Sequence, residues 1–414
     1  MVRIAIANAR CFVLPVETES RMRHASFRWL ALTMPVLAAA CARDDAPTAD
    51  FVINYEGVIP VTNTDPPPAR LELVVSIGPK TLTDTGSPDE FGRVSSLALG
   101  PNEELFVADD LNHEVKVFGL DGAHHRTFGR EGEGPGEFNS LNAVAWAGDR
   151  LLTFDPDLGR IGEWSAEGEW LGQRTTRAGV TGVPAWLRLY GVGPDEVFQF
   201  ALLGPDLQRF YVGHDSRGET GDTVAWMRAP PIGRPAIVCE FEDRIRFFPI
   251  PFAPRFLQHP GPGGVLYSAL NSAYRIFVTR NDGAEVLMVI ERPLPAESFS
   301  TAEWRAANAE YYEWRETRSD ASCDPRNPAR PDARPFIEDL FVAPDGKLWV
   351  EVVRAAGNRW EVFDTEGRLL GSVPAPPRRE EHVVPAFGPD YLLTIRRDSV
   401  DLDHVDVWRL ERGN

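Results

Sequence analysis

Six polar residues stand at or just before the start of β-rich runs, where their side chains could bind a ligand. They are Arg93, Asn142, Arg188, Arg255, Glu338 and Asp339. Carboxylate and amide oxygens are the ligands that Ca²⁺ prefers, whereas guanidinium groups bind carboxylates and phosphates. A set so rich in arginine favours an anionic ligand, or a structural ring of ion pairs, over a metal site. We therefore expect no cofactor and no metal.

Short motifs of the common enzyme classes are absent from the sequence. Neither G-x-S-x-G nor H-E-x-x-H occurs. The glycine-rich run 129–136 lacks the lysine and serine of a phosphate-binding loop, and strands rather than a helix are predicted around it. His124 and His125 are adjacent on a predicted strand, so they point to opposite faces and cannot easily share an ion. These patterns give no support to catalysis and leave it undecided.

The N-terminal region is typical of an export signal. A basic stretch at 22–28 is followed by the apolar run 29–37, three alanines and then Cys41. This order resembles a bacterial lipoprotein signal with Cys41 as the lipidated residue, although Leu37 sits one place too early, and ordinary cleavage near Ala40 is the alternative. Residues 1–21 fit no part of a signal and could be an over-extended start, with Met22 as the initiator. Residues 41–69 are predicted to be a flexible tether, since 42–68 is rich in Asp, Thr and Pro.

Four cysteines are present, at positions 11, 41, 239 and 323. Cys11 precedes the predicted cleavage point, and Cys41 is the lipidation candidate. Two exported cysteines more often form a disulfide than a metal site or a nucleophile. We therefore predict a bond between Cys239 and Cys323, with two free buried thiols as the alternative.

Composition limits the classes of partner. The chain of 414 residues carries 61 acidic and 43 basic side chains, a formal charge of -18. A field of that sign repels nucleic acid and anionic lipid, so we expect neither as a partner.

An internal repeat decides the expected fold. A tight turn followed by a β-rich run recurs at 100–107, 147–154, 193–198, 261–267, 343–349 and 388–393. Each copy follows another apolar run, so each predicts a hairpin. A second turn, with glycine after a polar residue, follows most copies: 121–122, 167–168, 217–218, 282–283 and 366–367. Two hairpins make four strands, and the spacing of about 46 residues is close to that of propeller blades.

The sixth unit lacks a fourth strand. After the β-rich run 403–410 only four residues remain, while the run 70–77 is left over at the other end of the chain. We predict an all-β, six-bladed β-propeller spanning 70–414, with 70–77 pairing beside 403–410 to close the ring.

The first complete unit resembles a known repeat family. Residues 105–118 follow a pattern of strand, Asp109, two residues, Asn112 and a second strand that ends in Phe118. This is similar to the NHL repeat, and the link 128–138 resembles the glycine-rich link of the same families. The resemblance implies a six-bladed propeller of the kind found in exported bacterial proteins, many without assigned activity. In that pattern Asp109 and Asn112 shape the turn between the second and third strands.

Two links between units are long, about 229–254 and 293–335. The second carries a helix signal, because residues 300–303 form a capping box and Phe299 with Trp304 forms a hydrophobic staple. We predict a helix within 297–317. Its stripe of Trp304, Ala307, Tyr311 and Trp314 packs on the ring or faces a ligand.

The sequence therefore predicts an exported envelope protein, as an outer-membrane lipoprotein or otherwise periplasmic or secreted. The expected function is a binding or scaffold propeller for a protein, peptide or glycan. Six-bladed propellers also include calcium-dependent lactonases and related hydrolases. The alternative is therefore a metal-dependent hydrolase or lyase with its site at the channel mouth.

Overall fold

The computed structural model describes residues 58–64, 66, 69–79, 86–175, 188–193, 196–203, 208–215, 227–229, 236–241, 244–280, 285–323, 330–379 and 384–412. All of them belong to one compact unit that begins at Ile53. The export signal, Cys11 and Cys41 lie outside the described residues, and so do the turns predicted at 217–218 and 282–283.

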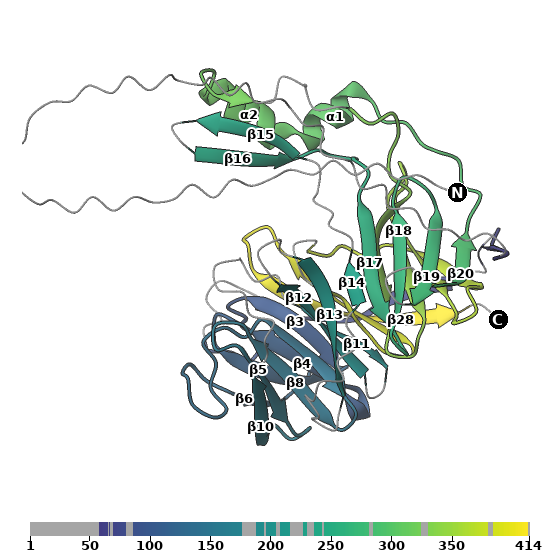
Figure 1. Ribbon diagram of the computed structural model, residues 1–414. Coiled ribbons are helices and arrows are strands. Elements are labelled where there is room, and N and C mark those ends of the chain that lie inside the picture. The colour runs from purple at the N-terminus through teal and green to yellow at the C-terminus, as the bar shows by residue number, and fades with distance from the viewer. Residues whose placement is uncertain are drawn as a thin grey trace, which may run out of the picture. The chain divides into compact units, whose positions relative to one another are not determined.

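The described part is mostly β-structure, and its strands form four-stranded antiparallel sheets in chain order (Figure 1). The first sheet comprises β3 (Val94–Leu99), β4 (Glu104–Asp109), β5 (Glu114–Gly119) and β6 (His124–Phe128). The second comprises β7 (Ala143–Ala147), β8 (Arg150–Asp155), β9 (Arg160–Trp164) and β10 (Trp170–Thr175). The third comprises β11 (Leu189–Gly193), β12 (Glu196–Leu203), β13 (Gln208–Asp215) and β14 (Met227–Ala229).

The other three sheets follow the same order. The fourth comprises β17 (Phe256–Gly261), β18 (Val265–Leu270), β19 (Arg275–Arg280) and β20 (Glu285–Glu291). The fifth comprises β22 (Ile337–Val342), β23 (Leu348–Val352), β24 (Arg359–Phe363) and β25 (Leu369–Pro374). The sixth comprises β26 (Ala386–Phe387), β27 (Tyr391–Arg397), β28 (Asp403–Arg412) and β2 (Ala69–Ile77).

The repeated turn lies at the same place in each sheet. All six copies join the first strand of a sheet to the second, as the hairpin prediction requires. The first copy also contains a short 3-10 turn, η1 (Pro101–Glu103). Burial follows strand position, since β4 is buried along almost its whole length whereas β6 is mostly exposed. Inner strands are therefore covered on both faces, which explains their continuous apolar runs.

Clusters of buried apolar side chains join neighbouring sheets. One representative pair for each cluster, in chain order, is Phe106 with Val144, Phe154 with Leu189, Tyr211 with Leu266, Ile276 with Leu348, Trp360 with Leu392, and Val405 with Leu105. Each sheet packs on the next one, and the sixth also packs on the first. Face-to-face packing of consecutive four-stranded sheets makes the arrangement propeller-like.

The N-terminal strand β2 pairs with the last strand of the chain, β28, as predicted. β2 pairs antiparallel with β28, from Ala69 opposite Arg412 to Ile77 opposite Val405. Ile77 is buried in the cluster between the sixth and first sheets. The segment is therefore both a hydrogen-bonded edge and part of the core.

Residues in the predicted tether also make contacts. β1 (Val61–Thr62) pairs parallel with β20, and Asn63 exchanges hydrogen bonds with the backbone of Gly367 and Leu369 at 2.9 and 2.8 Å. The fourth sheet thus gains a fifth strand that the sequence did not indicate.

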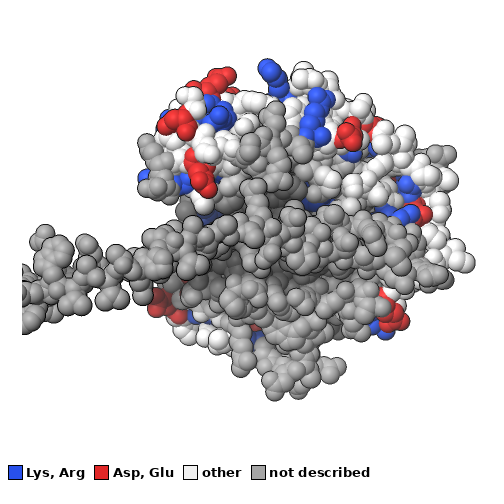
Figure 2. All heavy atoms as spheres, turned by 45° about the horizontal axis from the view of Figure 1, so that its top comes forward, with Lys and Arg blue, Asp and Glu red and all other residues white. Residues whose placement is uncertain are grey.

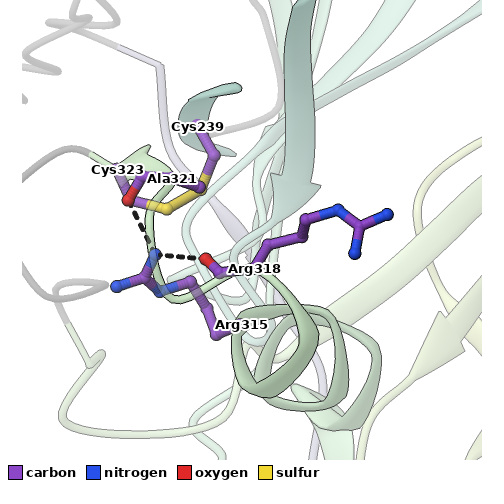
Figure 3. Close-up of a disulfide and its surroundings, with 5 residues drawn as sticks. All are labelled: Cys239, Arg315, Arg318, Ala321 and Cys323. Atoms are coloured by element: carbon purple, nitrogen blue, oxygen red, sulfur yellow. Dashed lines mark hydrogen bonds between the residues drawn. A yellow bond between two sulfur atoms is a disulfide. The ribbon is translucent and has the colours of Figure 1, made fainter. Parts of the chain in front are cut away.

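The long links form a small separate sheet. β15 (Ala236–Phe241) pairs with β16 (Arg244–Pro249) on one side and β21 (Ser322–Cys323) on the other. Cys239 and Cys323 face each other in this register and form the predicted disulfide, with Cα atoms 4.0 Å apart. Figure 3 shows the Arg315 guanidinium beside this bond, donating to the carbonyl oxygens of Arg318 and Ala321.

The predicted helix is present but divided into α1 (Thr301–Ala307) and α2 (Ala309–Thr317). The capping box at Ser300 and Glu303 is confirmed. Asn308 has non-helical dihedral angles, and its side chain donates to the carbonyl oxygen of Trp304 at 2.8 Å. An asparagine that bonds the backbone in this way competes with the helical pattern, which explains the break.

The aromatic stripe packs inside the long links. Tyr311 and Trp314 contact Phe248 of β16, with ring centroids 5.4 and 5.1 Å apart, and α2 runs alongside β15 and β16 in Figure 1. Tyr311 and Trp314 therefore pack in the core of the small sheet, whereas Trp304 contacts Phe299. The rings of Tyr311 and Trp314 thus pack on the small sheet, where the sequence analysis expected packing on the ring or contact with a ligand. Neither helix has the length or the hydrophobicity needed to cross a bilayer, as judged over the described residues.

Candidate functional site

A cavity of about 1030 Å³ lies among the first strands of the sheets. Residues of β3, β7, β11 and β26 form most of its wall, and β17 and β22 contribute His259 and Val342. Cavities of this size accept small-molecule ligands. This is the place where the sequence analysis expected binding residues to meet.

Four arginines line the cavity, and three of them have a carboxylate partner. Arg93 pairs with Asp110. Both Arg379 and Arg397 pair with Asp403, at 2.7 and 3.2 Å. Figure 2 shows the same mixing of charge on one face of the molecule, where basic and acidic side chains of the described residues lie side by side.

Arg188, which directly precedes β11, differs from the other three. Across the part of the chain that the structure describes, no carboxylate lies within ion-pair distance of its guanidinium. Its charge nevertheless reaches several groups. Burial raises the pKa of Tyr190 and the pKa of Asp339, and the charge of Arg188 opposes both rises. The guanidinium is therefore hydrogen-bonded to Tyr190 but has no carboxylate partner among the described residues.

His259 supplies a neutral polar group to the same wall. Burial, with the charge of Arg188 acting in the same direction, lowers its pKa to about 3, so the ring is uncharged at neutral pH. Its Nδ1 lies 2.6 Å from the carbonyl oxygen of Pro260 and 3.4 Å from the amide nitrogen of Val342. The shorter contact assigns the proton to Nδ1, which leaves Nε2 as an acceptor. A base with a pKa near 3 is a weak proton acceptor at neutral pH.

The structure divides the predicted site residues between two places. Arg93, Asn142 and Arg188 line the large cavity. Arg255 and Glu338 pair with each other and line a second cavity of about 320 Å³. Asp339 lines neither, and its carboxyl accepts the Leu340 N–H at 3.0 Å.

The carboxylates considered as metal ligands are engaged by positive charges. Glu338 pairs with Arg255, and the charges of Arg378, Arg255 and Arg188 act on Asp339. Within the described residues, no group of three or more His, Cys, Asp or Glu side chains is placed to hold a metal ion.

Sequence reasoning missed Arg379, Arg397 and His259. Arg379 lies in the link before β26 and Arg397 at the end of β27, away from the strand starts that were searched. His259 is the fourth residue of β17, where an inward-facing position could have been inferred from the alternation of a strand. Asp109, by contrast, has the predicted turn role, because it accepts from Asn112 at 2.8 Å and from the Arg93 N–H at 3.0 Å.

Comparisons with known proteins show only distant likeness. No family model matches the chain, and no curated protein matches its sequence. A candidate exported protein from Bacteroides fragilis is 12% identical, with a TM-score of 0.44, covering 86% of this chain and 100% of that one. A member of the DUF4221 family from Bacteroides vulgatus is 12% identical, with a TM-score of 0.44, covering 83% and 99%. Virginiamycin B lyase from Staphylococcus aureus is 10% identical, with a TM-score of 0.37, covering 78% and 82%.

Proposed function

We propose that the chain is an exported six-bladed β-propeller of the NHL-like kind that binds an anionic ligand in its central cavity. The six interfaces between consecutive sheets support a closed ring, and the pairing of β2 with β28 supports closure by the N-terminal strand. The ligand would be a small molecule, or the anionic end of a peptide or glycan.

The observation that carries the binding proposal is that Arg188 has no carboxylate partner among the described residues. The other arginines of the cavity have carboxylate partners, whereas none within reach of Arg188 is found among the described residues. A partly desolvated guanidinium binds carboxylate, sulfonate or phosphate groups strongly, because its N–H donors match their oxygens. Nε2 of His259 offers an acceptor to a donor on the same ligand.

Binding of 8-anilinonaphthalene-1-sulfonate, an apolar fluorescent anion, tests this proposal. We expect Arg188→Gln to weaken binding of the probe about tenfold, which corresponds to about 1.4 kcal/mol. N-phenyl-1-naphthylamine, which lacks the sulfonate, should bind both proteins equally. Arg280→Gln is the matched control, because Arg280 is half-exposed on β19, outside the cavity. Equal sulfonate affinity in the wild type and Arg188→Gln would overturn the assignment.

We further propose that lipidation of Cys41 attaches the protein to the envelope. Cys41→Ser should abolish metabolic labelling with a fatty acid and release the chain into the soluble fraction. The residue after Cys41 is Ala42 rather than Asp, which favours the outer membrane by resemblance to lipoprotein sorting rules. Labelling that persists in Cys41→Ser would contradict this proposal. As a control, Cys11→Ser should leave labelling unchanged.

A further inference from the structure

The charged residues that line the large cavity lie at one end of it. This is the end where the first strands of the sheets begin and where the second strands, which run antiparallel to them, finish. The charged residues there are Arg93, Asp110, Asp157, Arg188, Arg379 and Arg397. Arg379 belongs to this end because its backbone N–H bonds the carbonyl oxygen of Ile395, close to the end of β27.

The opposite end of the cavity, where the first strands finish and turn, is lined by apolar side chains. They include Leu99, Pro101, Trp146, Pro344 and Phe387. Pro101 and Pro344 are exposed, and Leu99 and Trp146 are half-buried, so apolar surface is accessible to a ligand there.

The turns at this apolar end contain acidic residues, but these face away from the cavity wall. Glu103, Asp149 and Asp345 belong to the turns after β3, β7 and β22, and none of them lines the cavity. Among the described residues, an anionic group therefore meets lining arginines at the charged end alone.

The wall between the two ends makes few demands for polar partners. The hydroxyl of Ser95 donates to the carbonyl oxygen of Leu141 at 2.6 Å, and the hydroxyl of Ser96 accepts the Val144 N–H at 3.1 Å. Much of the remaining wall is aliphatic, as at Leu97 and Val144. The six residues of β3 span about 20 Å, so a ligand that contacts both ends must be elongated.

These observations define the class of ligand more narrowly, on the basis of the proposed function. We infer that the cavity binds an amphiphilic anion, with an acidic head group at Arg188 and one elongated apolar tail. The tail lies along the first strands and reaches Trp146 and Pro344. A compact anion such as inorganic phosphate would leave the apolar end in contact with water, which forgoes the free energy of burying that surface.

Calorimetric titration of the full chain with hexanesulfonate, octanesulfonate and decanesulfonate, each below its micellar concentration, tests this inference. Each methylene buried strengthens binding roughly fourfold, so decanesulfonate should bind at least about tenfold more tightly than hexanesulfonate. Decyltrimethylammonium, which has the same tail and a cationic head, should bind at least about tenfold more weakly than decanesulfonate, because four arginines and two aspartates line the charged end.

Two variants separate the head group from the tail. Arg188→Gln should weaken all three sulfonates by a similar factor, since it changes the head-group contact alone. Pro344→Asp introduces a carboxylate at the apolar end and should weaken decanesulfonate about tenfold, while hexanesulfonate, whose tail is too short to reach it, changes by less than about twofold. Pro389→Asp is the matched control, because Pro389 occupies the corresponding exposed turn of the sixth sheet and does not line the cavity.

The outcomes distinguish this inference from the function on which it rests. Sulfonates that fail to bind, or that bind Arg188→Gln as tightly as the wild type, would contradict the anion site itself. Equal affinities for hexanesulfonate and decanesulfonate would leave the anion site in place and reject the elongated tail. A dependence on tail length that Pro344→Asp leaves unchanged would reject the position of the tail along the first strands. Tighter binding of decyltrimethylammonium than of decanesulfonate would reject the anionic head.

Discussion

A chain that begins at Gly78, and so lacks β2, is expected to lose cooperative folding. β2 supplies the last strand of the sixth sheet, and Ile77 with Val74 and Val75 packs in the cluster between the sixth and first sheets. A fully buried aliphatic side chain contributes roughly 1.5–3 kcal/mol. With the strand pairing added, the loss approaches the whole stability of a typical domain, about 5–15 kcal/mol.

The measurement is thermal unfolding followed by circular dichroism, with limited proteolysis as a second readout. A chain that begins at Ala69 keeps β2 and serves as the control, which should unfold cooperatively. Adding a synthetic peptide of residues 69–77 to the shorter chain should restore protease resistance, because the peptide can pair with the exposed edge of β28. A shorter chain as stable as the control would show that β2 does not close the sheet.

Point variants on the same strand refine this test. Ile77 is 4% exposed, whereas Leu73 is 47% exposed. Ile77→Asp should cost about 3–5 kcal/mol, because it opens the cluster and buries a carboxylate. Leu73→Asp should stay within about 0.5 kcal/mol of the wild type.

The repeat predicted much of the fold because it is local. Each turn copy specifies a hairpin within a few residues, so six hairpins could be placed without knowing how the sheets meet. The pairing of β2 followed from a missing strand at one end and a spare strand at the other. The disulfide followed from the number of exported cysteines and from the two links that carry them.

Long-range pairing explains what the sequence did not reveal. β15 and β16 are β-rich like any hairpin, but their sheet is completed by β21, only two residues long and far along the chain. β1 is equally short, and it pairs with β20 in parallel. Segments of two residues carry no periodicity, so no pattern could have identified them.

The candidate site, too, could be predicted only in part from the sequence. A search of the predicted strand starts identified Arg93, Asn142 and Arg188. These three residues lie in the wall of one cavity. They could not show that Arg255 and Glu338 pair with each other beside a second cavity. No pattern in the sequence indicated that Asp403 of the last sheet pairs with both Arg379 and Arg397. Ion-pair partners depend on side-chain directions, which spacing alone does not determine.

Asp403 forms a polar link between the last and first sheets, and its loss should destabilise the protein strongly. Its Oδ2 accepts the Val94 N–H of β3 at 2.9 Å, and Arg379 donates to both carboxylate oxygens at 2.8 and 2.7 Å. Arg379 also donates to the carbonyl oxygen of Val94. Asp403 is 4% exposed, so this charge pair is shielded from water.

Asp403→Asn should therefore lower the free energy of unfolding by about 3–5 kcal/mol, because Arg379 would remain buried without its main carboxylate partner. Asp401→Asn is the matched control, since Asp401 is exposed and makes only a surface pair with Arg397 at 3.4 Å; its effect should stay within about 0.5 kcal/mol. Denaturant unfolding of both variants gives the comparison.

The double variant Asp403→Asn with Arg379→Met should be less destabilised than the sum of its single changes, because removing the guanidinium also removes the unpaired charge. Additive effects would mean that the two side chains act independently of each other, which would contradict the coupled pair.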